Sequence, residues 1–185
     1  MSLVELIARA DERGLAVSGL ACLDRCVPLL GGDDEVLRPL WASLSPAAPA
    51  GDWAQRLEQA RGTLDAADGG ADEAVTLAHR MLAGAPAEWS AAGLREWADG
   101  CSVTALRIHR LLDGGGDDSG LADARRDGRS DGLSPLLAAE LRRQLTVLEL
   151  LAAHGPAGLR GALEVSTEGR RVLRAVVSRR SRRDA

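Results

Sequence analysis

Arginines crowd the C-terminal end of this 185-residue sequence, and they are its densest set of side chains able to bind another molecule. Seven of them fall within the last sixteen residues, where Asp184 is the one carboxylate that opposes them. They are Arg170, Arg171, Arg174, Arg179, Arg180, Arg182 and Arg183. Guanidinium groups bind carboxylates and phosphates, often through two parallel hydrogen bonds. The run is therefore a candidate contact site for an acidic protein surface or for nucleic acid.

An apolar stripe between these arginines predicts how they are presented. Val172, Leu173, Val176 and Val177 recur at helical spacing, which is typical of an amphipathic helix. Such a helix docks through its apolar side chains and leaves its arginines exposed. Three roles follow for them: a solvated end that favours solubility, a contact for the phosphates of nucleic acid, or a contact for an acidic partner, including the acidic part of this same chain.

The composition weakens the case for nucleic acid and excludes some chemistry. The sequence contains no Lys, Asn, Phe or Tyr, four residue types with AT-rich codons, which indicates a bacterial gene of high GC content. Every cation must then be Arg, so arginine enrichment alone is no evidence for phosphate binding. The pI of about 5.4 is low for a dedicated nucleic-acid binder, and no aromatic residue lies among the arginines to stack on bases. Without Lys, Schiff-base, pyridoxal-phosphate and P-loop chemistry is excluded.

Cysteine and histidine form no recognisable metal or catalytic set. Cys22 and Cys26 lie one helical turn apart, but no His lies within 50 residues of them and Cys101 is distant in sequence. We expect buried thiols that pack as small apolar groups, and we assign no metal site. The histidines fall on three different predicted helices: His79, His109 and His154. No nucleophile motif accompanies them, so no catalytic residue and no cofactor is assigned.

Acidic clusters and tryptophans have structural interpretations. Asp33, Asp34 and Glu35 precede an apolar periodic stretch, where negative charge stabilises the start of a helix. Successive helical residues point about 100° apart, so this run does not present paired carboxylates to a metal ion. We expect the four tryptophans in the core, with at least one of them alternatively lining a partner groove. They are Trp41, Trp53, Trp89 and Trp97.

The elements that position these side chains are predicted to be helices alone. Helical periodicity recurs along the chain, while the β-branched and aromatic residues that favour strands are scarce. Ser2 and Glu5 have the spacing of a capping box, and Ser134 followed by Pro135 is a typical helix start. Gly100 is expected to break the helical pattern. The predicted fold is all-α, a compact multi-helix bundle or helical array of about eight short helices with no sheet.

Charge divides the chain into three parts. Residues 1–113 carry a net charge of −7, residues 114–133 carry −2 and residues 134–185 carry +5, which together make the net −4. The first part is predicted to be an acidic helical domain, and the Gly/Asp-rich second part a flexible linker or loop. The third part, with the basic end, is predicted to pack on the first. Its predicted elements are an apolar, centrally placed helix over 136–154 and two shorter helical segments over 159–165 and 170–180.

A cytoplasmic location is expected. Charged residues at Glu5, Arg9 and Asp11 interrupt the N-terminal segment, which lacks the apolar run of a secretory signal. The most apolar stretch of the chain is interrupted by Glu149, so no membrane span and no membrane partner is predicted. Three cysteines are too few for a disulfide framework, in keeping with a reducing compartment.

Three function classes remain open from the sequence. The leading hypothesis is a non-enzymatic regulatory or accessory protein that acts through protein–protein contacts, because catalytic motifs are lacking and the charge is asymmetric. The first alternative is a regulator that binds DNA or RNA through the Arg-rich C-terminal helix. The second is an all-α enzyme whose polar residues converge only in three dimensions, in a solvent-accessible pocket that holds His79, His109 or clustered carboxylates.

Overall fold

The computed structural model describes residues 1–64, 70 and 72–185 of the chain. Over these residues every regular element is a helix, so the predicted all-α class is confirmed. The α-helices are α1 (Leu3–Arg9), α2 (Glu12–Arg25), α3 (Arg38–Ser43), α4 (Asp52–Leu64), α5 (Glu73–Ala83), α6 (Ala91–Leu112), α7 (Leu121–Asp127), α8 (Pro135–His154) and α9 (Leu159–Asp184). Two short 3-10 turns, η1 (Val27–Leu29) and η2 (Gly155–Gly158), precede α3 and α9. None of the described helices is both long and apolar enough to cross a membrane.

Polar caps begin several of these helices, and the sequence predicts two of them correctly. Ser2 accepts a hydrogen bond from the Glu5 amide, and the Glu5 carboxylate accepts one from the Ser2 amide, so α1 starts with a complete capping box. At the start of α8, the Ser134 hydroxyl caps the first turn and Pro135 occupies the first helical position. Asp72 caps α5 by accepting from two amides of its first turn.

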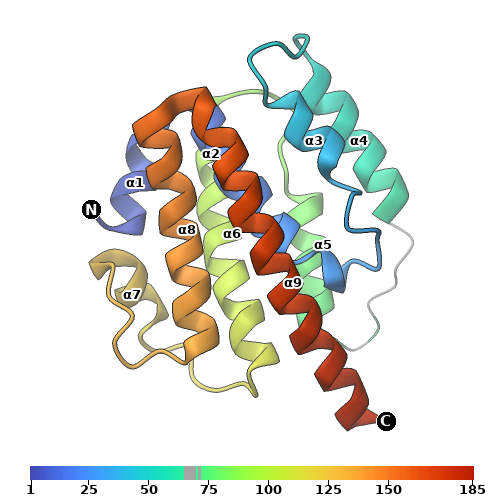
Figure 1. Cartoon of the computed structure of the whole chain (residues 1–185), viewed down its shortest axis with the longest axis vertical. Coiled ribbons are helices and arrows are strands. Elements are labelled where there is room, and N and C mark those ends of the chain that lie inside the picture. Colours follow the sequence, from blue (N-terminus) through green and yellow to red (C-terminus); the bar gives the residue numbers. More distant parts are fainter. Residues whose placement is uncertain (65–69, 71) are drawn as a thin grey trace.

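Helix α2 occupies the centre of the molecule, with α6, α8 and α9 packed around it (Figure 1). All twelve residues from Gly14 to Arg25 are buried. Small residues on α2 let its neighbours approach closely, and a Cβ at Gly19 would lie 2.5 Å from the Trp97 ring. The sequence predicts the central position for α8, but α8 leaves Arg142 and Glu149 exposed and lies at the side of α2.

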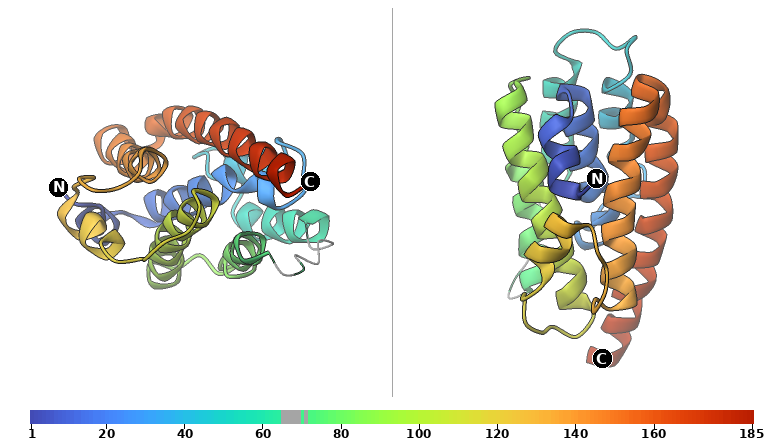
Figure 2. Two further views of the ribbon diagram at one scale, coloured as in Figure 1. Left: turned by 90° about the horizontal axis from the view of Figure 1, so that it is seen from below. Right: turned by 90° about the vertical axis from the view of Figure 1, so that its left-hand side faces the viewer.

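Helix α9 is one continuous 26-residue helix, where the sequence predicts two separate segments. It crosses α2 and α8, and its C-terminal end projects beyond the other helices (Figure 1 and the right panel of Figure 2). The predicted break is wrong because a glycine inside a helix costs only about 1 kcal/mol, which the packing of α9 offsets. Helix α6 likewise runs without interruption through Gly100.

The predicted linker contains an ordered helix, α7. Its seven residues are bounded by Gly120 and Gly128, both with positive φ. Leu121 and Ala124 are buried, and α7 packs against α1. The sequence does not predict α7 because one leucine and two alanines among charged residues make too weak a periodic pattern.

Candidate functional site

Two adjacent residues near the end of α2 bring opposite charges into the core. The Arg25 guanidinium has no exposed surface and donates two hydrogen bonds of 2.8 Å to the Glu140 carboxylate of α8. On the preceding residue, Asp24, both carboxylate oxygens lie 2.8 Å from Nη1 of Arg170 on α9. Helix α2 is therefore joined to both C-terminal helices by ion pairs that are shielded from water.

A chain of hydrogen bonds extends from Glu140 toward the surface through α6 and α7. Gln144 donates to the Glu140 carboxylate at 2.9 Å, and the Ser102 hydroxyl donates to the Gln144 side-chain oxygen at 2.6 Å. Arg125 donates to the Ser102 hydroxyl at 3.0 Å and also pairs with Asp99, which is half exposed. These hydrogen bonds offset part of the cost of burying the network, although Nη1 of Arg25 is buried without a hydrogen-bond partner among the described residues.

Helix α6 places His109 against the same buried carboxylate. Its Nδ1 lies 2.7 Å from the Ala105 carbonyl oxygen, and its Nε2 lies 3.5 Å from Glu140. Burial lowers the pKa of His109 despite the opposing effect of Glu140, so the imidazole is neutral at pH 7. Burial alone would raise the pKa of Glu140, but Arg25, His109 and the hydrogen bonds to the carboxylate lower it to about 2.

The pairing of His109 with Glu140 is the kind of convergence that the enzyme hypothesis requires, and the sequence does not reveal it. The pair is closed to solvent, however, since His109 is 1 % exposed and Glu140 is fully buried. The four grooves described for this molecule do not include either residue, or Arg25, among their walls. The cluster therefore holds α2, α6 and α8 in one arrangement rather than presenting reactive groups to a substrate.

Burial also raises the pKa of other ionisable groups in the core. Burial raises the pKa of Asp24 to about 6, against the opposing effects of Arg170 and Arg25. The three cysteines are free and buried, as the sequence predicts. Burial raises the pKa of the Cys22 thiol to about 12, which makes it a poor nucleophile. Within the described residues, no group of three or more His, Cys, Asp or Glu side chains is placed to hold a metal ion.

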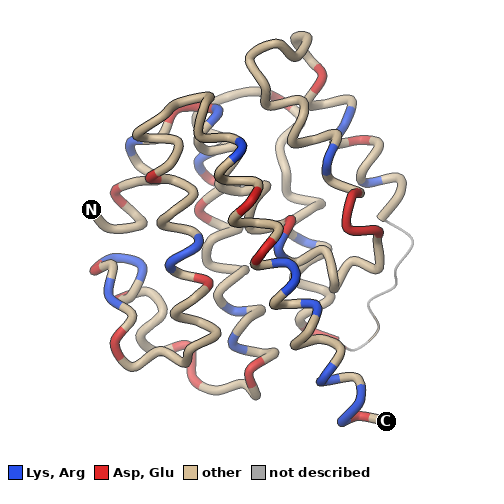
Figure 3. The backbone as a smooth tube through the Cα atoms, in the orientation of Figure 1, with Lys and Arg blue, Asp and Glu red and all other residues tan. Residues whose placement is uncertain are grey.

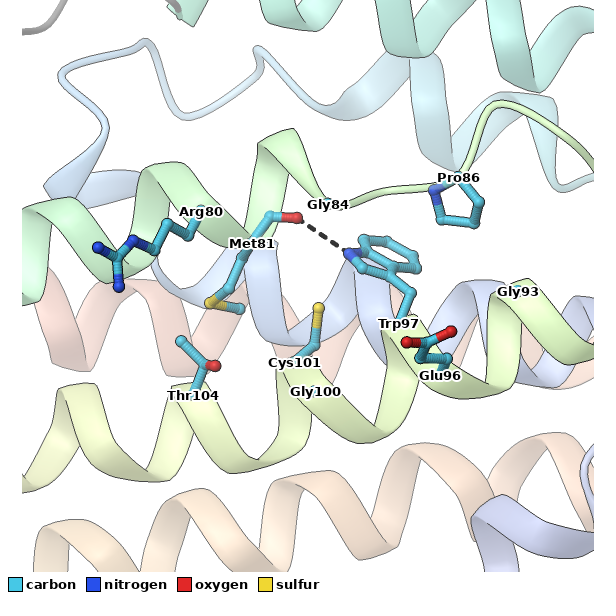
Figure 4. Close-up of a pocket in the computed structure, with 10 residues that line it drawn as sticks. All are labelled: Arg80, Met81, Gly84, Pro86, Gly93, Glu96, Trp97, Gly100, Cys101 and Thr104. Atoms are coloured by element: carbon cyan, nitrogen blue, oxygen red, sulfur yellow. Dashed lines mark hydrogen bonds between the residues drawn. The ribbon is translucent and has the colours of Figure 1, made fainter.

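The tryptophans form a cluster between α4, α5 and α6. Trp53 packs edge-on against Trp89 and Trp97, with ring centroids 5.9 Å apart in both pairs. Trp41, Trp53 and Trp97 are buried, which confirms a core position for them, whereas Trp89 is 46 % exposed. The Trp97 indole donates to the Met81 carbonyl at 2.9 Å and walls a shallow groove of about 420 Å³ between α5 and α6 (Figure 4).

The seven C-terminal arginines do not share one environment. Arg170 departs from the expected exposure, since it is 6 % exposed and belongs to the buried ion pair on α2. Arg174 pairs with Asp34, and the Arg180 guanidinium lies 3.5 Å from Asp72, so both bind carboxylates of the acidic part of the chain. Within the part of the chain that the structure describes, the arginines that are exposed and form no such pair are Arg171, Arg179, Arg182 and Arg183.

A groove of about 660 Å³ lies where the end of α9 passes the last turn of α6 and the first turn of α8. Its apolar walls come from all three helices: Leu111, Leu112, Leu136, Ala139, Val172 and Val176. Arg179, Arg180 and Arg183 line the same groove, as do Asp113 and Asp184. Figure 3 shows several arginine positions, in blue, on the part of α9 that projects beyond the other helices. We call this the α9 groove.

The α9 groove combines two kinds of contact that suit a peptide segment. Its valines and leucines offer apolar surface, and the stems of its arginines extend that surface while their charged ends stay in water. Within the described residues, neither Arg179 nor Arg183 forms an ion pair, so both guanidinium groups can bind carboxylates. The walls from α6 and α8 were not predicted; the one sequence signal is that α8 carries more apolar residues than one buried face requires.

The chain was compared with known proteins at the level of family, sequence and structure. No family model matches it, and neither does any curated protein or any solved structure.

Proposed function

We propose that this protein is a non-enzymatic regulatory or accessory protein that binds an acidic, amphipathic segment of a partner protein in the α9 groove. One observation carries the proposal: apolar walls from three helices meet in a groove that Arg179 and Arg183 also line. Apolar side chains of the bound segment supply most of the binding free energy. Its carboxylates, paired with the arginines, fix its orientation and speed its association.

Charge favours a protein over nucleic acid as the occupant of the α9 groove. Asp113 and Asp184 line the groove and repel a phosphate backbone, whereas an amphipathic peptide can direct its cationic or polar residues toward them. A phosphate backbone also offers little apolar surface to Val172 and Val176. Binding of DNA or RNA is the alternative proposal, and it uses the same arginines.

The proposal also assigns the protein to the cytoplasm, with no membrane partner. The free thiols at Cys22, Cys26 and Cys101 support a reducing compartment, because oxidising compartments favour disulfides. A cytoplasmic accessory protein would meet its partner at ordinary ionic strength, where exposed charges are screened beyond about 8 Å. Only carboxylates that come close to Arg179 and Arg183 then contribute to binding.

Two adjacent arginines near the end of α9, which point about 100° apart, provide the test. Arg183 lines the groove and Arg182 does not, although both are exposed. A photo-crosslinking amino acid at Val176 first captures the protein that occupies the groove in a cell extract. The captured protein is then purified, and its affinity for full-length variants is measured by calorimetry. We expect Arg183→Glu to weaken binding at least about tenfold and Arg182→Glu to change it less than about twofold.

Equal weakening by the two variants would contradict the proposal, because it would show that net charge, rather than the groove, binds the partner. The same two variants test the nucleic-acid alternative with short duplex DNA. Suppose that the logarithm of the DNA affinity falls linearly with the logarithm of salt concentration and that both variants weaken DNA binding alike. The proposal of nucleic-acid binding would then take the place of the proposal of protein-partner binding.

A further inference from the structure

One face of α6 stays exposed in the described part of the molecule and has the spacing of a helix–helix seam. Gly93, Glu96, Gly100, Val103 and Arg107 follow one another at alternating intervals of three and four residues. This is the spacing along which two helices pack side by side. Gly93 is partly exposed and the other four are exposed, with Val103 at 46 %. We call this set of five residues the α6 seam.

Shallow grooves border the α6 seam on both sides. The groove toward α5 is lined by Gly93, Glu96 and Gly100, and Figure 4 shows Glu96 on the open side of α6. The groove toward α1, of about 530 Å³, is lined by Glu96 again and by Val4, which is 40 % exposed. Beyond the backbone of α6 itself, no atom of the described residues lies within 4 Å of a Cβ built at Gly100. Helix α6 is thus a ridge that another backbone can approach closely.

The two ends of the α6 seam carry opposite charges. Glu96 and Arg107 are eleven residues apart on one helix, which separates their Cα atoms by roughly 16 Å and prevents contact within one chain. They are equally distant in sequence from the midpoint between Gly100 and Val103. If a second α6 runs antiparallel about that midpoint, Glu96 faces Arg107 of the second copy. By the same symmetry, Val103 faces Gly100 of the second copy.

We infer that a second copy of this chain docks on the α6 seam to form a two-fold symmetric dimer with antiparallel α6 helices. Two-fold symmetry makes each contact occur twice, so two Glu96–Arg107 pairs flank two Val103–Gly100 contacts. Arg107 already lies beside Glu73, but that pair is exposed and holds Arg107 only weakly. The α6 seam is complementary to itself in charge and in side-chain size. A second copy of this chain therefore fits it, whereas the helix of an unrelated protein would fit only by coincidence.

A charge swap tests this dimer by sedimentation velocity of the full chain over a range of concentrations. We expect the wild type to approach twice its 19.4 kDa mass at high concentration. Glu96→Arg or Arg107→Glu alone should raise the dissociation constant at least about tenfold, because each places like charges together twice. The double variant should restore the wild-type constant to within a few-fold. Such rescue can arise only between copies, since the two residues cannot meet within one.

A matched control reverses an exposed carboxylate away from the α6 seam. Glu58 of α4 is exposed, so Glu58→Arg makes the same charge change and should leave the dissociation constant unaltered. The inference is overturned by a wild type that remains monomeric at millimolar concentration, by a dimer that Glu96→Arg does not weaken, or by a double variant that stays dissociated. No residue of the α6 seam lines the α9 groove, so failure of the dimer is distinct from failure of partner binding.

Discussion

Gly169 shows how a partner distant in sequence can dictate a residue type. A Cβ atom at this position would lie 2.4 Å from Cδ of Arg25 and 3.0 Å from Cδ of Arg143. Arg25 cannot move aside, because Glu140 holds its guanidinium in a site without exposed surface. Gly169 lies inside α9, so glycine is needed there for the close approach of two helices and not for a turn.

The substitution Gly169→Ala should therefore destabilise the protein, contrary to the usual effect of alanine in a helix. Overpacking against the buried guanidinium is expected to lower the free energy of unfolding by about 1–3 kcal/mol, measured by urea denaturation. Gly62 of α4 provides the control, since it is exposed and, beyond its own helix backbone, no described atom lies within 4 Å of the added Cβ. Gly62→Ala should raise the free energy of unfolding by up to about 1 kcal/mol. A stabilising effect of both variants would refute the packing argument.

Glu140 gives the protein a measurable sensitivity to acid. Its pKa is about 2 in the folded state against an ordinary value of 4.5, so the unfolded chain binds the proton more tightly. The contribution of Glu140 to stability is therefore complete above pH 4.5 and is lost as the pH falls toward 2. Between pH 5 and pH 3 we expect Glu140 to account for a loss of about 2 kcal/mol in the free energy of unfolding.

Comparison with Glu140→Gln isolates this loss from those of other carboxylates. At pH 7 the variant should be less stable than the wild type by about 3–5 kcal/mol, because Arg25 is left buried and unpaired. Urea denaturation at several pH values should show that difference shrinking as the pH falls from 5 to 3. A difference that does not change with pH would mean that Glu140 titrates normally in the folded protein.

At the residue scale, the parts of the candidate site that depend on nearby residues could be predicted from the sequence. The parts that depend on ion pairs between distant residues could not. The C-terminal arginines, the buried thiols and the helix caps all follow from neighbours a few residues away. The pairs of Arg25 with Glu140 and of Asp24 with Arg170 join positions 115 and 146 residues apart. No local pattern identifies Arg170 as a core residue, because the nearest arginines in sequence, Arg171 and Arg174, are exposed.

Among the elements, α9 has two roles that divide along its length. Its first half supplies Ala162, Ser166, Gly169 and Arg170 to the core, while its last turns project into solvent. The sequence predicts the amphipathic second half correctly as a helix. The sequence also predicts a break before that half, in the stretch that ends at Gly169, and this prediction is wrong. A glycine can interrupt a helix or allow close packing, and the two cases cannot be distinguished until the side chains that contact it are known.

Deletion of residues 178–185 should separate these roles. The deletion removes Arg179, Arg180, Arg182 and Arg183 but leaves Val176 and Val177 packed on the core. Among the described residues, the deletion removes the ion pair of Arg180 with Asp72, which is partly exposed, so the free energy of unfolding should change by less than about 1 kcal/mol. Affinity for the groove partner should fall at least about tenfold. A large loss of stability in thermal denaturation would show that the projecting turns belong to the fold.

At the scale of the whole molecule, the charge asymmetry of the sequence is partly resolved inside the chain. Helix α9 directs three of its arginines to carboxylates of the acidic part, at Asp24, Asp34 and Asp72. The all-α class was predictable because it depends on composition and periodicity, which are local. The central place of α2 was not, since it depends on which helices tolerate close neighbours on every side.

The buried charges on α2 also affect when this helix can be buried during synthesis of the chain. Arg25 leaves the ribosome 115 residues before its partner Glu140, and Asp24 leaves it 146 residues before its partner Arg170. Until then, burying α2 would strand two unpaired charges in an apolar interior. We therefore expect α2 to become fully buried only after α8 and α9 have been synthesised. A polypeptide that stops before α9 would lack the partner of Asp24, so we expect it to leave α2 incompletely buried.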